Sequence, residues 1–368
     1  PVFGVCGSSH AGRHKFVTGT KMSDTNESEV IEVGDLDPEQ WNEYAIEQDW
    51  SDGMPLFAPT EDKVGRFVET CRGDNEPFSP MPPRRVIPTL ESIAANAVMA
   101  GCRPEYFPVV VATVRALLNP EYNLHGTLAT THPCAPGIIL SGPVREKMDL
   151  NCGSNCFGQG RRANATIGRA VQLALLNIGG AKPGEMDRST QGSPAKYAFC
   201  FGENEEESPW EPYHVRRGFD ATDSVVTVLP CEPPHNINDH ASTTGEGILT
   251  TVAGTISQTG SNNLYANAPH TVVFGPEHAH TVHRDGWTIP DIQQKLYEAS
   301  AVHVSRVSEE NQENFRVDRG HEPVNDCYYL GRSPEDIHIL VAGGPGKHSA
   351  YIPTFGFTEA CSVRMAHV

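Results

Sequence analysis

A short apolar segment that ends in Gly-Pro and runs into polar sequence occurs three times in this chain of 368 residues. The first copy spans residues 138–143, the second 272–276, and a looser third copy 339–345. Proline suits the first position of a helix, so the pattern predicts a strand that leads directly into a helix. Such a turn leaves backbone N–H groups free at the helix start, where anions are often held. The repeated turn therefore predicts both an architecture and a place for chemistry.

Helical and extended patterns alternate along most of the chain. Apolar periodicity and capping residues predict helices over residues 60–70, 89–99, 104–118, 165–178, 242–258 and 289–299. Strands are predicted at 124–131, 137–140, 197–201 and 225–229, and a strand, turn and strand at 337–358. This alternation predicts an α/β fold with a mixed or mostly parallel sheet and flanking helices.

The predicted elements divide the chain into two similar halves, residues 89–222 and 223–368. In each half a helix precedes a strand, the Gly-Pro turn, a short helix and a longer helix. An internal duplication and a chance repetition of strand–helix order are both open. Residues 1–21 are interpreted as an appended or non-core segment, because Met22 resembles a natural start. Residues 22–88 are predicted to form an extended N-terminal arm and a Pro-rich connector.

Charge and cysteine content exclude several classes of function. The net charge of −18 argues against a nucleic-acid or anionic-membrane partner. No segment reaches the roughly 18–20 apolar residues of a membrane-spanning helix. The acidic runs at 203–207 and 309–313 are predicted to be solvated faces. Ten unevenly spaced cysteines favour free thiols or metal sites in a reducing cytosol over a secreted disulfide framework.

Two cysteines are candidate nucleophiles. Cys102 lies between the end of one predicted helix and the start of the next, beside Arg103, a setting that stabilises a thiolate. The alternative is a buried thiol that fills a tight corner. His132 and Cys134 are two positions apart, between prolines. They could form a Cys–His couple, act as two metal ligands, or belong to an ordinary loop.

A glycine-rich loop at residues 158–160 precedes Arg161 and Arg162 at the start of a predicted helix. Backbone N–H groups and a guanidinium group suit a carboxylate or a phosphate. The loop lacks the glycine spacing and the Lys-Ser/Thr pair of nucleotide-binding fingerprints, so no nucleotide cofactor is expected. Surface arginines at a helix start are the alternative. The Cys152 and Cys156 spacing is poor for a zinc site.

Histidines gather near the second Gly-Pro turn. Glu277 and His278 stand at the turn itself and are the better candidates there, whereas His280 and His283 are expected to be exposed on the helix. His240 precedes a capped helix, and capping does not explain it. It could therefore be a general base or a ligand.

The third copy of the turn carries Lys347 and His348 in a flexible, cationic loop at a strand end. Open α/β sheets bind ligands at such positions. A simple connecting loop is the alternative.

Three segments, residues 94–106, 162–180 and 275–279, resemble a family of uncharacterised bacterial proteins, the UGSC-like group. The similarity covers most of residues 50–365. It implies no particular activity, cofactor or catalytic residue.

Together these patterns predict a cytosolic enzyme of hydrolase or lyase type that acts on a small anionic molecule where the Gly-Pro turns converge. The candidate catalytic residues are Cys102, Cys134, His240, Glu277 and His278. The candidate substrate-binding residues are Gly142, Arg162, Asn164, Gly275, Lys347 and His348. Two alternatives are a metal-dependent enzyme, with His132 and His278 as ligands of a divalent transition metal, and a non-catalytic binding or assembly protein. We also expect a homo-oligomer with no nucleic-acid or membrane partner.

Overall fold

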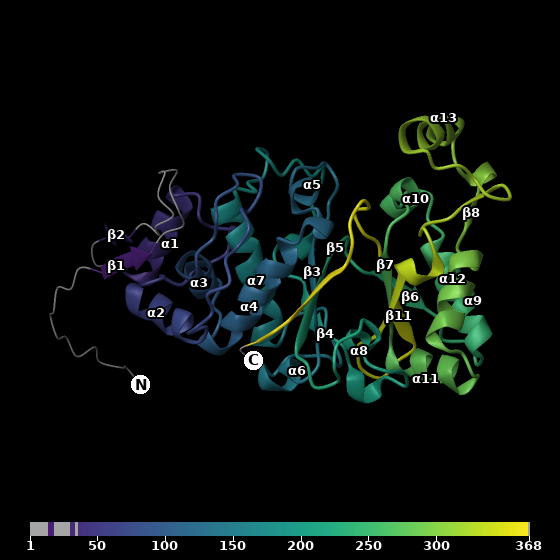
Figure 1. The fold of residues 1–368 in the computed structure, drawn as a ribbon, viewed down its shortest axis with the longest axis horizontal. Coiled ribbons are helices and arrows are strands. Elements are labelled where there is room, and N and C mark those ends of the chain that lie inside the picture. Colours follow the sequence, from purple (N-terminus) through teal and green to yellow (C-terminus); the bar gives the residue numbers. More distant parts are fainter. Residues whose placement is uncertain (1–13, 18–29, 34–35, 367–368) are drawn as a thin grey trace, which may run out of the picture.

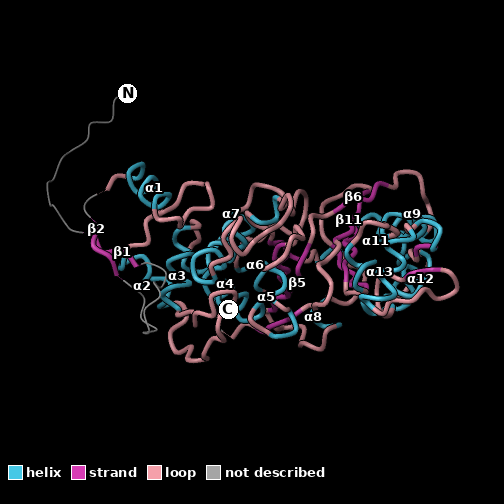
Figure 2. The backbone as a smooth tube through the Cα atoms, turned by 90° about the horizontal axis from the view of Figure 1, so that it is seen from above, coloured by secondary structure: helices cyan, strands magenta, loops and turns pink. Residues whose placement is uncertain are grey.

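The computed structural model describes residues 14–17, 30–33 and 36–366. The molecule is elongated, with N-terminal helices, a first sheet and a second sheet following one another along its long axis (Figures 1 and 2). The N-terminal strands β1 (His14–Val17) and β2 (Val30–Val33) form an antiparallel pair.

The first sheet has four strands in the order β12 (Cys361–Arg364), β5 (Val225–Cys231), β3 (Ala135–Ser141) and β4 (Cys200–Gly202). Strand β3 is parallel to β4 and antiparallel to β5. All seven residues of β3 are buried. A continuous apolar strand is expected where both faces of a sheet are covered.

The second sheet has the order β10 (Ile337–Val341), β7 (His270–Phe274), β11 (His348–Ile352) and β6 (His235–Asn238). Strand β7 is parallel to β10 and antiparallel to β11, which repeats the arrangement around β3. The predicted α/β class with mixed sheets is therefore confirmed. Apart from the edge strands β12 and β6, the strands of the two sheets share one connectivity, and a duplication stays a prediction.

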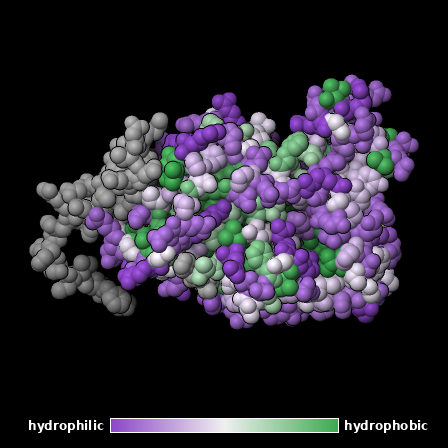
Figure 3. Space-filling model, viewed as in Figure 1, coloured by the Kyte–Doolittle hydropathy of each residue, from purple (hydrophilic) through white to green (hydrophobic). Residues whose placement is uncertain are grey.

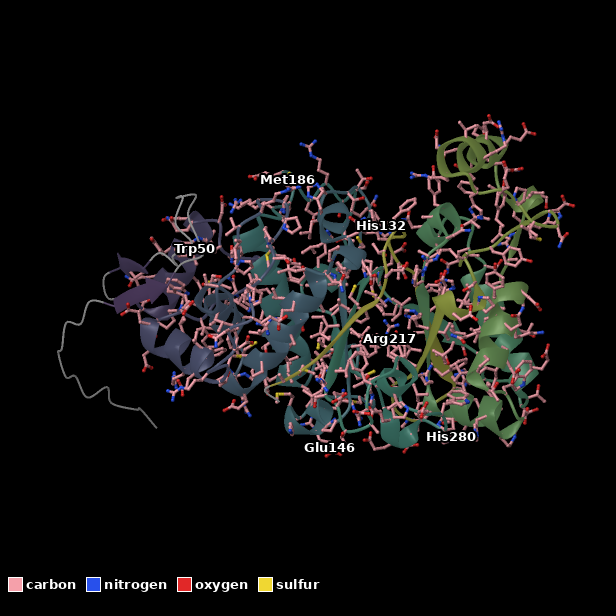
Figure 4. The ribbon with its side chains drawn as sticks, in the orientation of Figure 1. Trp50, His132, Glu146, Met186, Arg217 and His280 are labelled. Atoms are coloured by element: carbon pink, nitrogen blue, oxygen red, sulfur yellow. The ribbon has the colours of Figure 1, made fainter. Side chains whose placement is uncertain are left out.

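The two halves exchange their edge strands. Strand β5 belongs to the first sheet but is followed by β6 in the second, and β11 in the second sheet is followed by β12 in the first. In Figure 1 the yellow end of the chain crosses from the second half to the first. Arg217 supports this crossing, because its guanidinium group donates to Ser362 Oγ at 2.9 Å and to the Ala360 carbonyl at 2.8 Å (Figure 4). A boundary after residue 222 therefore does not separate the two sheets.

Helices of the first half pack around an apolar core next to the first sheet. They are α3 (Leu90–Met99), α4 (Phe107–Leu117), α6 (Val144–Lys147) and α7 (Arg162–Ala174). Thr89 caps the start of α3, as its sequence predicts, and the Ser92 side chain completes a reciprocal capping box with it.

Helices of the second half enclose a separate core. They are α9 (Gly245–Ile256), α10 (Asn262–Ala266), α11 (Pro276–Arg284) and α12 (Ile289–Ala299). Helix α13 (Glu309–Asn314) has no buried residue and projects outward from this half (Figure 1). A small strand pair, β8 (Val302–His303) and β9 (Cys327–Tyr328), lies beside this core.

The structure corrects several local predictions. Part of the predicted extended arm is a helix, α1 (Pro38–Glu47). It is stabilised by burial of the Trp41 side chain in the first core. Helix α2 (Glu61–Glu69) was predicted correctly. Residues 124–131 begin with a short helix, α5 (Leu124–Leu128), instead of a strand. The strand, turn and strand predicted at residues 337–358 are confirmed as β10 and β11, because the chain reverses at the third Gly-Pro copy through glycines with positive φ.

Within the described residues, none of the helices combines the length and the apolarity needed to cross a bilayer. The face shown in Figure 3 is mostly hydrophilic, with smaller hydrophobic groups over its central part.

Candidate functional site

The first and second Gly-Pro turns lie along one edge of the molecule, at the starts of α6 and α11, and the third turn packs against the second. Helices α6, α8 (Tyr213–Arg216) and α11 lie along this edge (Figure 1), and His280 on α11 and Glu146 on α6 mark it in Figure 4. Asn204 links the first half to the third turn, because its Nδ2 donates to the Gly343 carbonyl at 3.0 Å. Gly275 of the second turn packs on the backbone of the third, where an added Cβ would lie 2.2 Å from the His348 carbonyl oxygen.

A buried serine–histidine pair lies between the second and third turns. Ser349 Oγ is 2.8 Å from His278 Nδ1 and accepts a hydrogen bond from the Gly275 N–H at 3.3 Å. The other ring nitrogen of His278, Nε2, is 3.1 Å from the Asp239 carbonyl oxygen. A carbonyl oxygen can only accept, so Nε2 carries the proton and Nδ1 accepts the serine hydroxyl hydrogen.

The electrostatics of the pair favour a neutral imidazole. Burial lowers the pKa of His278, against a smaller opposing effect of the hydrogen bond to Asp239. Neutral His278 has a basic lone pair aimed at the Ser349 hydroxyl. A nucleophile beside a base that a third group orients is the arrangement used in nucleophilic catalysis.

Cationic and titratable side chains surround this pair. The exposed rings of His240 and His348 approach with their Nε2 atoms 3.1 Å apart, and Asn236 Oδ1 lies 3.0 Å from His348 Nδ1. Lys347 Nζ donates to the His240 carbonyl at 3.2 Å. Helix α11 starts nearby without a side-chain cap. These groups can hold a small anion.

Five residues predicted from the sequence therefore lie together. They are His240, Gly275, His278, Lys347 and His348. The neighbouring Glu277 is exposed, and His280 and His283 are exposed as predicted. Ser349 was not among the predicted residues. The only sequence signal for it was its place beside His348, at a strand start after a glycine-rich turn.

Cys102 does not have the predicted activated thiolate. Its side chain is buried and donates to the Thr166 carbonyl at 3.2 Å. Burial raises the pKa of Cys102 to about 12, which outweighs the nearby positive charge of Arg162. Arg162 itself donates to the Gly101 carbonyl at 2.8 Å. These two hydrogen bonds connect the end of α3 to α7, away from the second and third Gly-Pro turns.

Cys134 and His132 do not form a couple. Cys134 is buried beside a cavity of 420 Å³ in the first half, and burial raises the pKa of its thiol to about 12. His132 Nε2 instead pairs with Glu232 Oε1 at 2.8 Å. The metal pair of His132 and His278 stays a prediction; both ring nitrogens of His278 are engaged by Ser349 and Asp239.

Asn164 and Gly142 have structural contacts. The buried Asn164 amide donates to the carbonyls of Asn151 and Cys200 and so fixes the loop before α7. Gly142 has φ of 80° and donates its N–H to Glu205 Oε1 at 2.6 Å. Gly142 is thus part of an acidic cluster behind the first turn.

This cluster was missed because residues 203–207 were interpreted as a solvated face. Glu203 and His214 are fully buried, and Glu205 is mostly buried beside Arg145. Burial raises the pKa of Glu203 to about 7. A usable signal was present, because Glu203 directly follows strand β4 and is therefore at the edge of the core. The run at 309–313 is solvated, as predicted, apart from the half-buried Gln312.

Comparisons of the chain with protein-family models, curated proteins and solved structures found no match. Its function is therefore inferred from the geometry of the site.

Proposed function

We propose that this chain is a cytosolic enzyme of hydrolase type that acts on a small anionic molecule at the junction of the second and third Gly-Pro turns. The observation that carries the proposal is the 2.8 Å hydrogen bond from Ser349 Oγ to Nδ1 of His278, whose Nε2 faces the Asp239 carbonyl. The nine described cysteines are free thiols, which supports a reducing compartment.

In the proposed reaction Ser349 Oγ attacks a carbonyl or phosphoryl centre while its proton passes to His278 Nδ1. A bond to the leaving group breaks, and protonated His278 gives that proton to the leaving group. Water then hydrolyses the covalent intermediate with His278 as the base. The Asp239 carbonyl holds the ring in the tautomer that this sequence requires.

Positive charge next to the pair favours an anionic substrate. Lys347 and the exposed rings of His240 and His348 lie at the same end of the sheet as Ser349. The uncapped start of α11 adds backbone N–H groups and the positive end of a helix dipole. A carboxylate or phosphate group on the substrate would be held by these groups.

Thiol chemistry at Cys102 or Cys134 is less well supported, because the raised pKa values leave almost no thiolate near neutral pH. A lyase that uses His278 as its base and not Ser349 as a nucleophile is the second candidate. The two candidates differ in whether a covalent serine adduct forms.

The test uses small carboxylate esters and phosphate monoesters with a chromogenic leaving group, together with a sulfonyl fluoride that modifies activated serines. We expect turnover of at least one substrate class and a sulfonyl adduct on Ser349 in peptide mass spectra. Ser349→Ala should abolish both turnover and adduct. Turnover that survives in Ser349→Ala but is lost in His278→Gln would assign the base role to His278 without a serine nucleophile. No turnover and no adduct in the wild type would overturn the proposal.

A further inference from the structure

We propose that the buried cluster of Glu203, Glu205 and His214, behind the first Gly-Pro turn, binds a divalent metal ion. Each residue offers one ligand atom, and these atoms all lie within 4.8 Å of one another. The site is distinct from the Ser349–His278 pair, and the proposal does not depend on the proposed hydrolase activity.

Several buried polar atoms of this cluster have no hydrogen-bond partner, which indicates that they bind a ligand. Glu203 and His214 are each 0% exposed. Glu203 Oε1 and both ring nitrogens of His214 have no hydrogen-bond partner. Buried polar atoms in folded proteins are nearly always satisfied, and three such atoms on two neighbouring side chains need a common explanation. A cation bound between a carboxylate oxygen and an imidazole nitrogen supplies one.

The rest of the cluster positions its ligands from outside. The second oxygen of Glu203, Oε2, accepts from the Tyr213 N–H at 2.8 Å. Glu205 Oε1 accepts from the Gly142 N–H at 2.6 Å and lies 3.0 Å from Arg145 Nε. Outer hydrogen bonds of this kind orient carboxylate ligands and leave another atom for the metal.

The neighbouring charges can accommodate a divalent ion. Arg145 lies closest, but its two terminal nitrogens bind the Glu206 carboxylate at 2.9 and 2.8 Å. Arg216 also faces Glu203, and its Nη2 donates to the Ile339 carbonyl at 2.6 Å. The two arginines therefore face three glutamates, so the cluster carries at most one net negative charge before a cation binds.

The ligand set selects the class of metal. Two carboxylates and one imidazole, without a thiolate, suit Mn²⁺, Fe²⁺, Co²⁺ or Zn²⁺ better than a soft ion such as Cu(I). Glu205 is the most accessible ligand, with 13% of its side chain exposed. Glu206 and Glu207 continue the acidic surface outward, with side chains 58% and 57% exposed. They would raise the local concentration of cations at the entrance.

The test begins with the full chain after removal of metals by a chelator. Equilibrium dialysis against Co²⁺ or Mn²⁺ is expected to give one tightly bound equivalent, and Co²⁺ should produce a visible absorption band with an imidazole N–H signal shifted by the paramagnetic ion. Glu203→Gln and His214→Gln should each weaken binding about 10- to 100-fold or more. The matched control Glu207→Gln removes a nearby exposed carboxylate and should leave binding unchanged.

A second control removes the exposed histidine pair. His348→Asn should keep the tight equivalent, whereas loss of binding in His348→Asn with retention in Glu203→Gln would assign the metal to the exposed pair and overturn the proposal. Binding of less than about a tenth of an equivalent by wild-type protein would also overturn it. If a variant of a buried ligand fails to fold, the wild-type stoichiometry and Co²⁺ spectrum still test whether the chain binds a metal.

Discussion

Ser349 and His278 are 71 positions apart in the chain, and the serine hydroxyl donates to Nδ1 of the histidine across 2.8 Å. Removing the hydroxyl removes the proposed nucleophile and leaves the imidazole in place. We expect Ser349→Ala to lower kcat/KM by a factor of about 10² to 10⁴, and His278→Gln by a similar factor. Steady-state kinetics on the chromogenic substrates that the wild type turns over measures both.

A matched control exists on the surface of the second half. Ser305 Oγ and His303 Nδ1 are also 2.8 Å apart, but both residues are exposed. Ser305→Ala should leave kcat/KM unchanged. An equal loss in Ser305→Ala and Ser349→Ala would mean that the effect reports general stability and not catalysis.

Cys102 should be almost unreactive in the folded protein. Its pKa of about 12 leaves a thiolate fraction of about 10⁻⁴ at pH 8, far below that of an unfolded thiol. We expect iodoacetamide to alkylate Cys102 at least about 100-fold more slowly in native protein than in urea-unfolded protein. Peptide mass spectra over time give the rates, and the half-buried Cys327 serves as the internal reference. Rapid native labelling of Cys102 would restore it as a candidate nucleophile.

Gly275 should tolerate no side chain, because a Cβ there would lie 2.2 Å from the His348 carbonyl oxygen. Its φ of −68° is ordinary, so the cost comes from the close contact alone. We expect Gly275→Ala to lower the free energy of unfolding by about 1–3 kcal/mol. Urea unfolding followed by circular dichroism measures this change.

The control for this substitution is Gly254, an exposed glycine in α9 with no atom within 4 Å of an added Cβ. Gly254→Ala should raise the free energy of unfolding by up to about 1 kcal/mol, because alanine favours a helix. A similar loss of stability in both variants would contradict the close contact at the second turn.

His270 should make the fold sensitive to acid. Burial lowers the pKa of His270, against a weaker effect of its bond to the Ala268 carbonyl. The unfolded chain therefore binds a proton at this residue below about pH 6.5 while the folded chain does not. Stability is full above that pH and falls as the pH drops toward the lowered pKa of the folded state, with a slope of up to about 1.4 kcal/mol per pH unit.

His270→Phe removes this titration. At pH 7 the unfolding free energy of the variant should be about 1 kcal/mol lower, because the substitution removes the bond to Ala268. Between pH 7 and pH 5 it should change less than that of the wild type. Urea unfolding at the two pH values tests the difference. Equal pH slopes in the two proteins would show that His270 does not contribute.

Much of the fold could be predicted from the sequence because its signals are local. Thr288 and Asp291 form the capping box that starts α12, and the predicted bounds of that helix match the structure. Residues 124–128 were predicted wrongly, because a five-residue segment offers too little periodicity to separate a helix from a strand.

The candidate site was only partly predictable. Gly275, His278 and Lys347 stood out because they lie in or beside Gly-Pro turns, where strand ends place side chains at the edge of a sheet. Cys102 also stood out, for its helix start and its neighbouring arginine. Its burial, which raises its pKa despite the nearby charge of Arg162, depends on packing against α7.

The sequence by itself determined the strand–Gly-Pro turns, most helices and the mixed α/β class, since caps, prolines and apolar periodicity act within a few residues. Only the tertiary structure decided that β6 and β12 cross between the two sheets, that Glu203 is buried within an acidic run, and that Ser349 meets His278. These outcomes depend on contacts between residues far apart in the chain. A local sequence pattern does not contain the energies of such contacts.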